Sequence, residues 1–328
     1  MRTKDLRDAV VVLTGASSGI GRAAAQEFAR CGAALFLVAR DRRALHDVAE
    51  TCHRLGGQAR IVVADVSQPD DMERVARSTF DTAGRIDVWV NNAGVGALGP
   101  FEEVPREVHE QVLQTDLLGG LRGAHAVLPY FKRQECGTLI NNVSLGGWAP
   151  QPYAASYSAA KFGLRAFGES LRGELRHWPN IHVCNLFPSV MDTPGFRDGA
   201  NYTGRVVKPV PPVYDPRRTA RAIVGLARRP RPSVYVGLPA VLSLFAQWVP
   251  GYSTINASLV DASLRRARPQ AESSGNLFAP PGGERRIDGR FRSPRLRRRV
   301  LTVASAATVV ASISWMLSQR HQRSARRG

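Results

Sequence analysis

The composition of this 328-residue chain, with 44% hydrophobic and 22% charged residues, is that of a folded protein. Its formal net charge of +18 is uneven, because residues 265–328 hold 15 arginines against three acidic residues. That balance is +12, which leaves only +6 for residues 1–264. The basic excess therefore belongs to the tail, where no aromatic residues alternate with the arginines, and we expect no nucleic-acid partner.

The four cysteines are far apart, and no pair has the spacing of metal ligands: Cys31, Cys52, Cys136 and Cys184. We expect them to be reduced core residues, and we expect no metal site. The first apolar run, at residues 9–13, is too short for a signal peptide. The sequence therefore favours a cytoplasmic location for the catalytic part.

Short apolar runs alternate with helix-length amphipathic segments from residue 9 to about residue 237. The runs are rich in Val, Ile and Leu without polar alternation, as in parallel strands buried on both faces. They predict strands at Ala9–Thr14, Ala34–Ala39, Ala59–Ala64, Ile86–Val90, Thr138–Val143, His182–Phe187 and Ser233–Val236. Helices are predicted between them, for example at Gly19–Arg30, Arg42–Leu55 and Pro69–Ala83. This order predicts an α/β fold with a doubly wound parallel sheet, a Rossmann fold.

A glycine-rich turn follows the first predicted strand and opens the first predicted helix. Its glycines allow a tight turn, and the N–H groups at the positive end of a helix can bind a pyrophosphate. The turn could be structural only, but its place between strand and helix favours a dinucleotide site. The candidate residues are Gly15, Ser17, Ser18, Gly19, Ile20 and Gly21.

The second predicted strand ends in Ala39 and Arg40, where an acidic residue would accept from the ribose of NAD. Arg40 can instead contact a 2′-phosphate, so NADP(H) is the expected cofactor and NAD(H) the alternative. Asp41 offsets part of that charge. Further candidates follow the third and fourth strands, although each could be a turn residue: Asp65, Val66, Asn91, Ala93 and Gly94.

Ser144 follows the fifth predicted strand, and Tyr157 and Lys161 come shortly after it. On a helix, residues four apart share one face. An ammonium beside a phenol favours the phenolate, which makes Tyr157 a candidate general acid and base. Ser144 can donate a hydrogen bond to the reacting oxygen.

Together these motifs resemble the short-chain dehydrogenase/reductase family, with its glycine-rich turn, Asn-Asn-Ala-Gly and Tyr-x-x-x-Lys. The resemblance covers about residues 5–237. It implies that Tyr157 exchanges the proton with the substrate, that Ser144 positions the substrate oxygen, and that Lys161 also holds the nicotinamide ribose. The segment after the sixth strand resembles the family's lid segment, with Ser189 where glycine is usual. Its implied cofactor contacts are Pro188, Val190 and Thr193.

One residue departs from the family's pattern, because Asp116 stands where a catalytic asparagine is usual. Its carboxylate can accept a hydrogen bond from a relay water but cannot donate one, and it would stabilise the Lys161 ammonium. The sequence therefore predicts an NADP(H)-dependent oxidoreductase acting on carbonyl or alcohol groups. The alternative is a membrane-tethered nucleotide-binding protein of the same fold with little or no turnover.

Aromatic and proline residues after Ser144 and in the predicted lid favour an apolar small-molecule substrate, although they could equally serve packing. The chain is divided by composition into four parts. These are a catalytic domain (1–264), a disordered Arg/Pro/Gly-rich linker (265–299), a hydrophobic helix (300–318) and a basic tail (319–328). A homo-oligomer is a further possibility that the sequence leaves open.

Residues 300–317 are uncharged, and as a helix they would rise about 27 Å, just short of a bilayer core of about 30 Å. A span would carry the last four arginines across the bilayer, which the positive-inside rule disfavours. Two modes of membrane association therefore remain, a transmembrane helix or a helix on an anionic membrane surface, beside no association.

Overall fold

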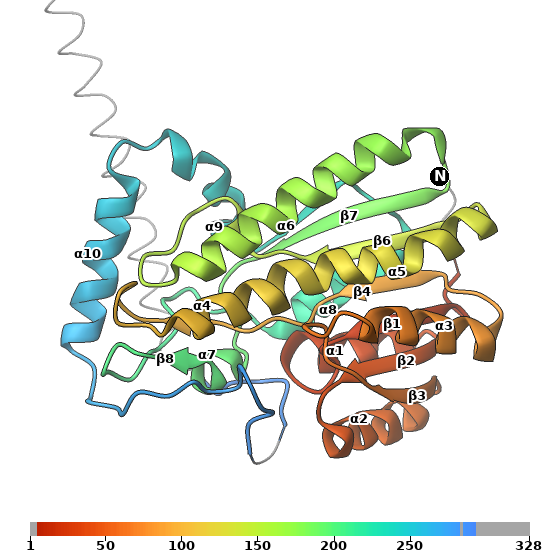
Figure 1. Ribbon diagram of the computed structural model, residues 1–328, viewed down its shortest axis with the longest axis horizontal. Coiled ribbons are helices and arrows are strands. Elements are labelled where there is room, and N and C mark those ends of the chain that lie inside the picture. Colours follow the sequence, from red (N-terminus) through yellow and green to blue (C-terminus); the bar gives the residue numbers. More distant parts are fainter. Residues whose placement is uncertain (1–4, 283–284, 293–328) are drawn as a thin grey trace, which may run out of the picture.

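The computed structural model describes residues 5–282 and 285–292. Seven parallel strands form one sheet in the order β3-β2-β1-β4-β6-β7-β9 (Figure 1). The strands are β1 (Val10–Thr14), β2 (Ala34–Ala39), β3 (Gln58–Val63), β4 (Val88–Asn91), β6 (Gly137–Asn142), β7 (Ile181–Pro188) and β9 (Ser233–Val236). The doubly wound parallel sheet predicted from the sequence is therefore confirmed, and each predicted strand occurs within a few residues of its predicted bounds.

Helices cover both faces of the sheet. Those on one face are α1 (Gly19–Ala29), α2 (Arg42–Arg54) and α8 (Pro216–Arg228), and those on the other are α3 (Asp71–Ala83), α5 (Gly119–Gln134) and α6 (Ala155–Glu174). The remaining helices are α4 (Arg106–Leu113), α7 (Gly195–Asp198), α9 (Leu238–Leu242) and α10 (Tyr252–Arg265). Val11 and Leu13 of β1 lie in the core layer with α1, α2 and α8, whereas Val10 and Val12 lie in the layer with α3 and α5. Alternate residues of one strand thus fill two cores, which explains its unbroken apolar sequence.

A second sheet contains only β5 (Ala97–Leu98) and β8 (Ala200–Asn201), which pair in parallel. It joins the chain after β4 to the chain after α7. Strands of two residues leave no periodic pattern in the sequence, so this pair was not predicted.

Three buried asparagines form a ladder across the middle of the sheet. The Asn91 amide donates to Asn141 Oδ1 at 3.0 Å, and the Asn141 amide donates to Asn185 Oδ1 at 3.2 Å. Asn91 also donates to the Gly120 carbonyl and accepts from the Trp89 indole. The side chain of Asn91, which we expected to bind a cofactor, is thus committed inside the sheet, and a cofactor contact would have to come from its backbone.

The chain after α10 runs back along the domain, below β8 and α7 toward the red end of the sheet (Figure 1). Leu277 is fully buried, and Ile287 is 8% exposed against the core. We expected a disordered linker at 265–299, but its described residues pack against the domain. Backbone groups and arginines contribute to this packing, for example the Asn276 N–H on the Asp198 carbonyl and Arg285 on Asp41. The division into domains stays a prediction.

Among the described residues, no helix is long and apolar enough to cross a bilayer. The predicted hydrophobic helix (300–318) and the basic tail (319–328) lie outside the described residues.

Candidate active site

The glycine-rich turn is packed tightly against the loop after β4. Gly15 has a φ of +66°, and a Cβ there would lie 2.7 Å from the Ala93 Cα. A Cβ at Gly21 would overlap the Gly15 carbonyl oxygen. Side chains at these two positions are therefore excluded by the fold itself. The turn leaves the N-terminus of α1 at the carboxyl edge of the sheet, where Ser18 makes no capping hydrogen bond with its side chain.

Arg40, at the end of β2, lies 3.7 Å from the Asp65 carboxylate at the end of β3, measured between Nη1 and Oδ2. The neighbouring Asp41 faces a different arginine, Arg285, at 2.8 Å. Burial alone would raise the pKa of Asp41, but the Ala44 N–H and the Arg285 guanidinium hold it below its ordinary value. Asp41 therefore stays ionised and paired, and its charge is offset by Arg285.

Asp116 lies in a π-helical turn, Gln114–Leu118, between α4 and α5. Its Oδ1 accepts from the Val95 N–H at 2.7 Å, and its Oδ2 lies 2.8 Å from Lys161 Nζ. The turn carries one extra residue per helical repeat, a feature that is frequent at functional sites. The structure thus brings Asp116 and Lys161 together in a fully enclosed ion pair.

Burial and charge act against each other in this pair. Burial would lower the pKa of Lys161, but the Asp116 carboxylate raises it above its ordinary value. Burial also raises the pKa of Asp116, against the attraction of Lys161 and the hydrogen bond from Val95. The Asp116 carboxylate therefore favours the charged form of Lys161.

Ser144 and Tyr157 meet at Gly146, next to β6. Ser144 has a φ of +120°, a conformation that favours glycine, and its Oγ accepts from the Gly146 N–H at 3.1 Å. A Cβ at Gly146 would lie 3.2 Å from the Tyr157 ring and 3.6 Å from Ser144 Oγ. The missing side chain lets the tyrosine ring approach the serine. Lys161 Nζ lies 5.5 Å from the centre of the Tyr157 ring, so the three predicted residues form one cluster.

A small cavity of about 10 Å³ adjoins the cluster and is lined by Asn91, Thr115 and Asp116, among others. This volume is close to what one water molecule requires. Gly94 borders the same carboxylate, since a Cβ there would lie 3.2 Å from Asp116 Oδ2. Val66 packs against Gly119 at the start of α5.

The segment after β7 lies against the glycine-rich turn. The Thr193 methyl group lies 3.4 Å from where a Gly19 Cβ would be, and Ser189 Oγ accepts from the Ala240 N–H. Asp192, which was not predicted from the sequence, is 2% exposed, and its Oδ2 lies 2.9 Å from Arg292 Nε. An acidic residue after the strand was visible in the sequence, but its partner, a hundred residues later, was not.

Two aromatic residues expected near the substrate are engaged in packing. Trp148 stacks under the Arg165 guanidinium at 3.7 Å and lies against Phe187. The Tyr153 hydroxyl donates to Asp261 of α10, which raises the pKa of the phenol. The apolar character of the substrate therefore stays a prediction.

Comparisons with known proteins agree on one family. The family model described as "short chain dehydrogenase" matches residues 9–201. The "Uncharacterized oxidoreductase YxnA" of Bacillus subtilis is 29% identical over 98% of this chain and 93% of its own length. "11-beta-hydroxysteroid dehydrogenase 1A" of Arabidopsis thaliana is 37% identical over 58% of this chain, and the match spans only 54% of that relative.

Two solved structures are similar in fold. One is an alcohol dehydrogenase from the archaeon Thermococcus sibiricus complexed with 5-hydroxy-NADP, at 30% identity and a TM-score of 0.61 over 70% of this chain and 95% of that one. The other is a metagenomic short-chain oxidoreductase in complex with NADP, at 28% identity and a TM-score of 0.62 over 72% and 100%. With its parallel sheet, glycine-rich turn and Ser144–Tyr157–Lys161 cluster, the chain belongs to the short-chain dehydrogenase family.

Proposed function

We propose that this protein is an NADP(H)-dependent oxidoreductase that interconverts a carbonyl and an alcohol on a small, apolar substrate. The observation that carries the proposal is the enclosed Asp116–Lys161 ion pair beneath Tyr157. Burial of each charge costs on the order of several kcal/mol. Such a pair is therefore more typical of a functional site than of an interaction that stabilises the fold.

The residues around the turn fit a dinucleotide with a 2′-phosphate. The first turn of α1 presents backbone N–H groups, and Arg40 presents a guanidinium 24% exposed at the ends of β2 and β3. Gly15, Ser17, Ser18, Gly19, Ile20 and Gly21 would hold the pyrophosphate, and Asp65 and Val66 the adenosine. When bound, the nicotinamide supplies or accepts the hydride. That solved relatives were crystallised with NADP or 5-hydroxy-NADP supports this choice.

In the reductive direction, Tyr157 donates its phenolic proton to the substrate oxygen. Ser144 donates a hydrogen bond to the same oxygen, and its position is fixed by the contact with Gly146. Lys161 stabilises the phenolate that remains, because its charge is held in place by Asp116. A water in the cavity beside Asp116 could then return a proton, with the carboxylate as acceptor only.

The test is Tyr157→Phe in the purified full chain, assayed with NADPH against a panel of apolar aldehydes and ketones. We expect turnover to fall by about 10²–10⁴-fold, since general acid–base catalysis is worth that much. NADPH affinity should change little, because the ring still packs at Gly146. A variant that keeps more than about a tenth of the activity would remove Tyr157 from this role.

The alternative function is a nucleotide-binding protein with little or no turnover. The observation that favours it is Asp116 in place of the usual asparagine. Wild-type protein that binds NADPH but reduces none of the substrates at any pH from about 5 to about 10, a range that contains the ordinary pKa values of histidine and cysteine, would support it.

A further inference from the structure

Three donors that we assign to the phosphates of a dinucleotide are bonded to carbonyl oxygens of this same chain. Arg40 donates to the Leu277 carbonyl at 2.8 Å and to the Asn276 carbonyl at 2.5 Å. The Gly19 N–H donates to the Arg286 carbonyl at 2.9 Å. All three acceptors lie in residues 273–282 and 285–292, which we call the strap. Its carbonyl oxygens stand where phosphate oxygens would bind.

The strap is anchored along its length by side chains. Leu277 is fully buried in the apolar cluster against which Tyr157 packs. Arg285 pairs with Asp41, and Arg22 donates to the Arg285 carbonyl at 2.6 Å. The strap therefore reaches from the catalytic tyrosine to the end of β2, along the path that a dinucleotide would follow.

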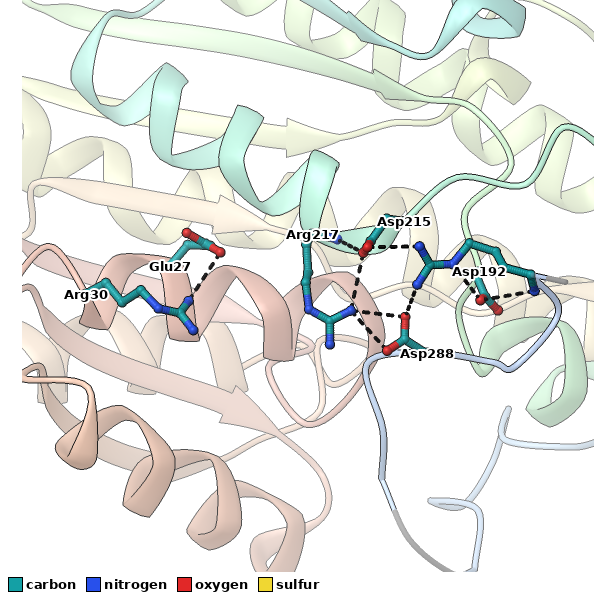
Figure 2. Close-up of polar contacts among 7 residues, drawn as sticks. Glu27, Arg30, Asp192, Asp215, Arg217 and Asp288 are labelled. Carbon is teal, nitrogen blue, oxygen red and sulfur yellow. Dashed lines mark hydrogen bonds and ion pairs between the residues drawn. The ribbon is translucent and has the colours of Figure 1, made fainter. Parts of the chain in front are cut away.

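Further along, the strap closes over the segment after β7. The Gly289 N–H donates to the Asp192 carbonyl at 3.0 Å, and the Phe291 N–H donates to the Asp192 carboxylate at 2.9 Å. Arg292 then joins Asp192, Asp215 and Asp288 in one ion-pair cluster (Figure 2). The strap therefore contacts the glycine-rich turn at Gly19 and the segment after β7 at Asp192, which are the two sides of the proposed cofactor site.

Two glycines of the strap are needed for this close approach. Gly275 has a φ of +54°, and a Cβ there would overlap the carbonyl oxygen of Asp198. A Cβ at Gly289 would overlap the carbonyl oxygen of Thr193. Gly282, in the same strap, has nothing within 4 Å of its Cβ position. The two contacting glycines can therefore be altered, with Gly282 as control, without changing any residue proposed to bind cofactor.

We propose that the strap is an autoinhibitory segment that occupies the dinucleotide site and must leave it before cofactor phosphates bind. This inference rests on the proposed NADP(H) function. Binding is then reduced by the fraction of molecules whose strap is displaced. Any event that holds the strap away from Arg40 and Gly19 activates the enzyme.

The first experiment compares the full chain with Gly275→Ala/Gly289→Ala and with Gly282→Ala, and NADPH affinity is measured by calorimetry. We expect the double variant to bind NADPH at least about tenfold more tightly, since the competing segment is displaced. Gly282→Ala should bind like the wild type. Equal affinity of the double variant and the wild type, with both folded, would overturn the proposal.

The second experiment needs no variant and covers the case in which the double variant fails to fold. Saturating NADPH is added to the wild type, and hydrogen exchange is followed at the amides of Asn276, Gly289 and Phe291. We expect exchange to rise at all three, because the strap is expelled. Exchange that is unchanged or slowed would mean that the strap stays or closes on the cofactor, and would overturn the proposal.

The two experiments separate the strap from the function on which it rests. If NADPH binds equally well with and without an intact strap, the cofactor assignment stands and the strap proposal fails. If neither protein binds NADPH or NADH, although exchange shows the strap released in the double variant, the proposed function is wrong and the inference falls with it.

Discussion

Lys161 and Asp116 form an ion pair inside the domain, with side chains 6% and 0% exposed. Arg292 instead joins three aspartates, of which Asp215 and Asp288 lie at the surface and Asp192 is 2% exposed. The surface cluster in Figure 2 contains Arg217 as a second cation, which also contacts Asp215 and Asp288. Arg292, Asp215 and Asp288 are each about 30% exposed. The interior pair has one partner for each charge, and the surface cluster shares its charges among several.

The two arrangements differ in how much stability is lost when one charged group is removed. An enclosed charge that loses its partner is left uncompensated inside the protein, so the interior pair is costly to break. Arg217, Asp215 and Asp288 of the surface cluster are partly exposed to solvent and each has two ion-pair partners, so the loss of Arg217 costs little. The first arrangement suits the catalytic role proposed for Lys161, whose position must stay fixed. The second suits the release and return proposed for the strap.

The largest expected effect follows from breaking the interior pair. Asp116→Ala should lower the free energy of unfolding by about 3–5 kcal/mol, because Lys161 is left buried and uncompensated. Urea unfolding of the full chain measures it. The control is Asp116→Ala/Lys161→Met, which removes both charges and should recover much of the loss. A single variant as stable as the wild type would mean that the pair is not enclosed as described.

The next effect concerns Arg40. Arg40→Ala should weaken NADPH binding by about 1.5–3 kcal/mol, the worth of hydrogen bonds to a charged group, and should leave NADH binding nearly unchanged. Because the strap also uses Arg40, the measurement is sharpest in the Gly275→Ala/Gly289→Ala background. Arg54→Ala removes the same charge at the far end of α2 and should have no effect. Equal affinity of the unmodified protein for NADPH and NADH would contradict the assignment.

A conservative change at the interior pair should appear in the pH profile. Asp116 raises the pKa of Lys161, so Asp116→Asn should lower it. Because its pKa is raised, the Lys161 ammonium stays charged up to a higher pH. Removing the carboxylate lowers the pH at which this charge is lost. The alkaline limb of the kcat/KM profile should move to lower pH in Asp116→Asn. An alkaline limb at the same pH in both proteins would show that Lys161 does not govern it.

The smallest effect on global stability is expected at the surface cluster. Arg217→Ala should cost at most about 1 kcal/mol in urea unfolding, since its pairs with Asp215 and Asp288 are partly exposed and both carboxylates keep Arg292. Hydrogen exchange at Gly289 should nevertheless rise, because the neighbouring strap residue Asp288 loses one of its two arginine partners. Arg266→Ala, an exposed arginine of α10's C-cap, is the matched control and should change neither quantity. A loss of unfolding free energy as large as that of Asp116→Ala would show that the interior pair and the surface cluster do not differ in this way.

The sequence by itself determined the parallel sheet and the glycine-rich turn, and it placed Tyr157 and Lys161 of the proposed catalytic set on one helix face. Unbroken apolar runs such as Val10–Thr14 are typical of strands buried on both faces of such a sheet. Tyr157 and Lys161 share a helix face by their spacing of four residues. These features are local, so they could be predicted from the order of residues.

Tertiary structure alone decided which distant groups meet. Asp116 was visible in the sequence, but only the π-helical turn places its carboxylate 2.8 Å from Lys161. Arg285 reaches Asp41 across 244 positions, and the strap binds Arg40 and Gly19 through backbone carbonyls. Every residue has a backbone carbonyl, so such contacts leave no signature in the sequence. For the same reason a segment poor in apolar residues was expected to be disordered, although it packs at the proposed dinucleotide site.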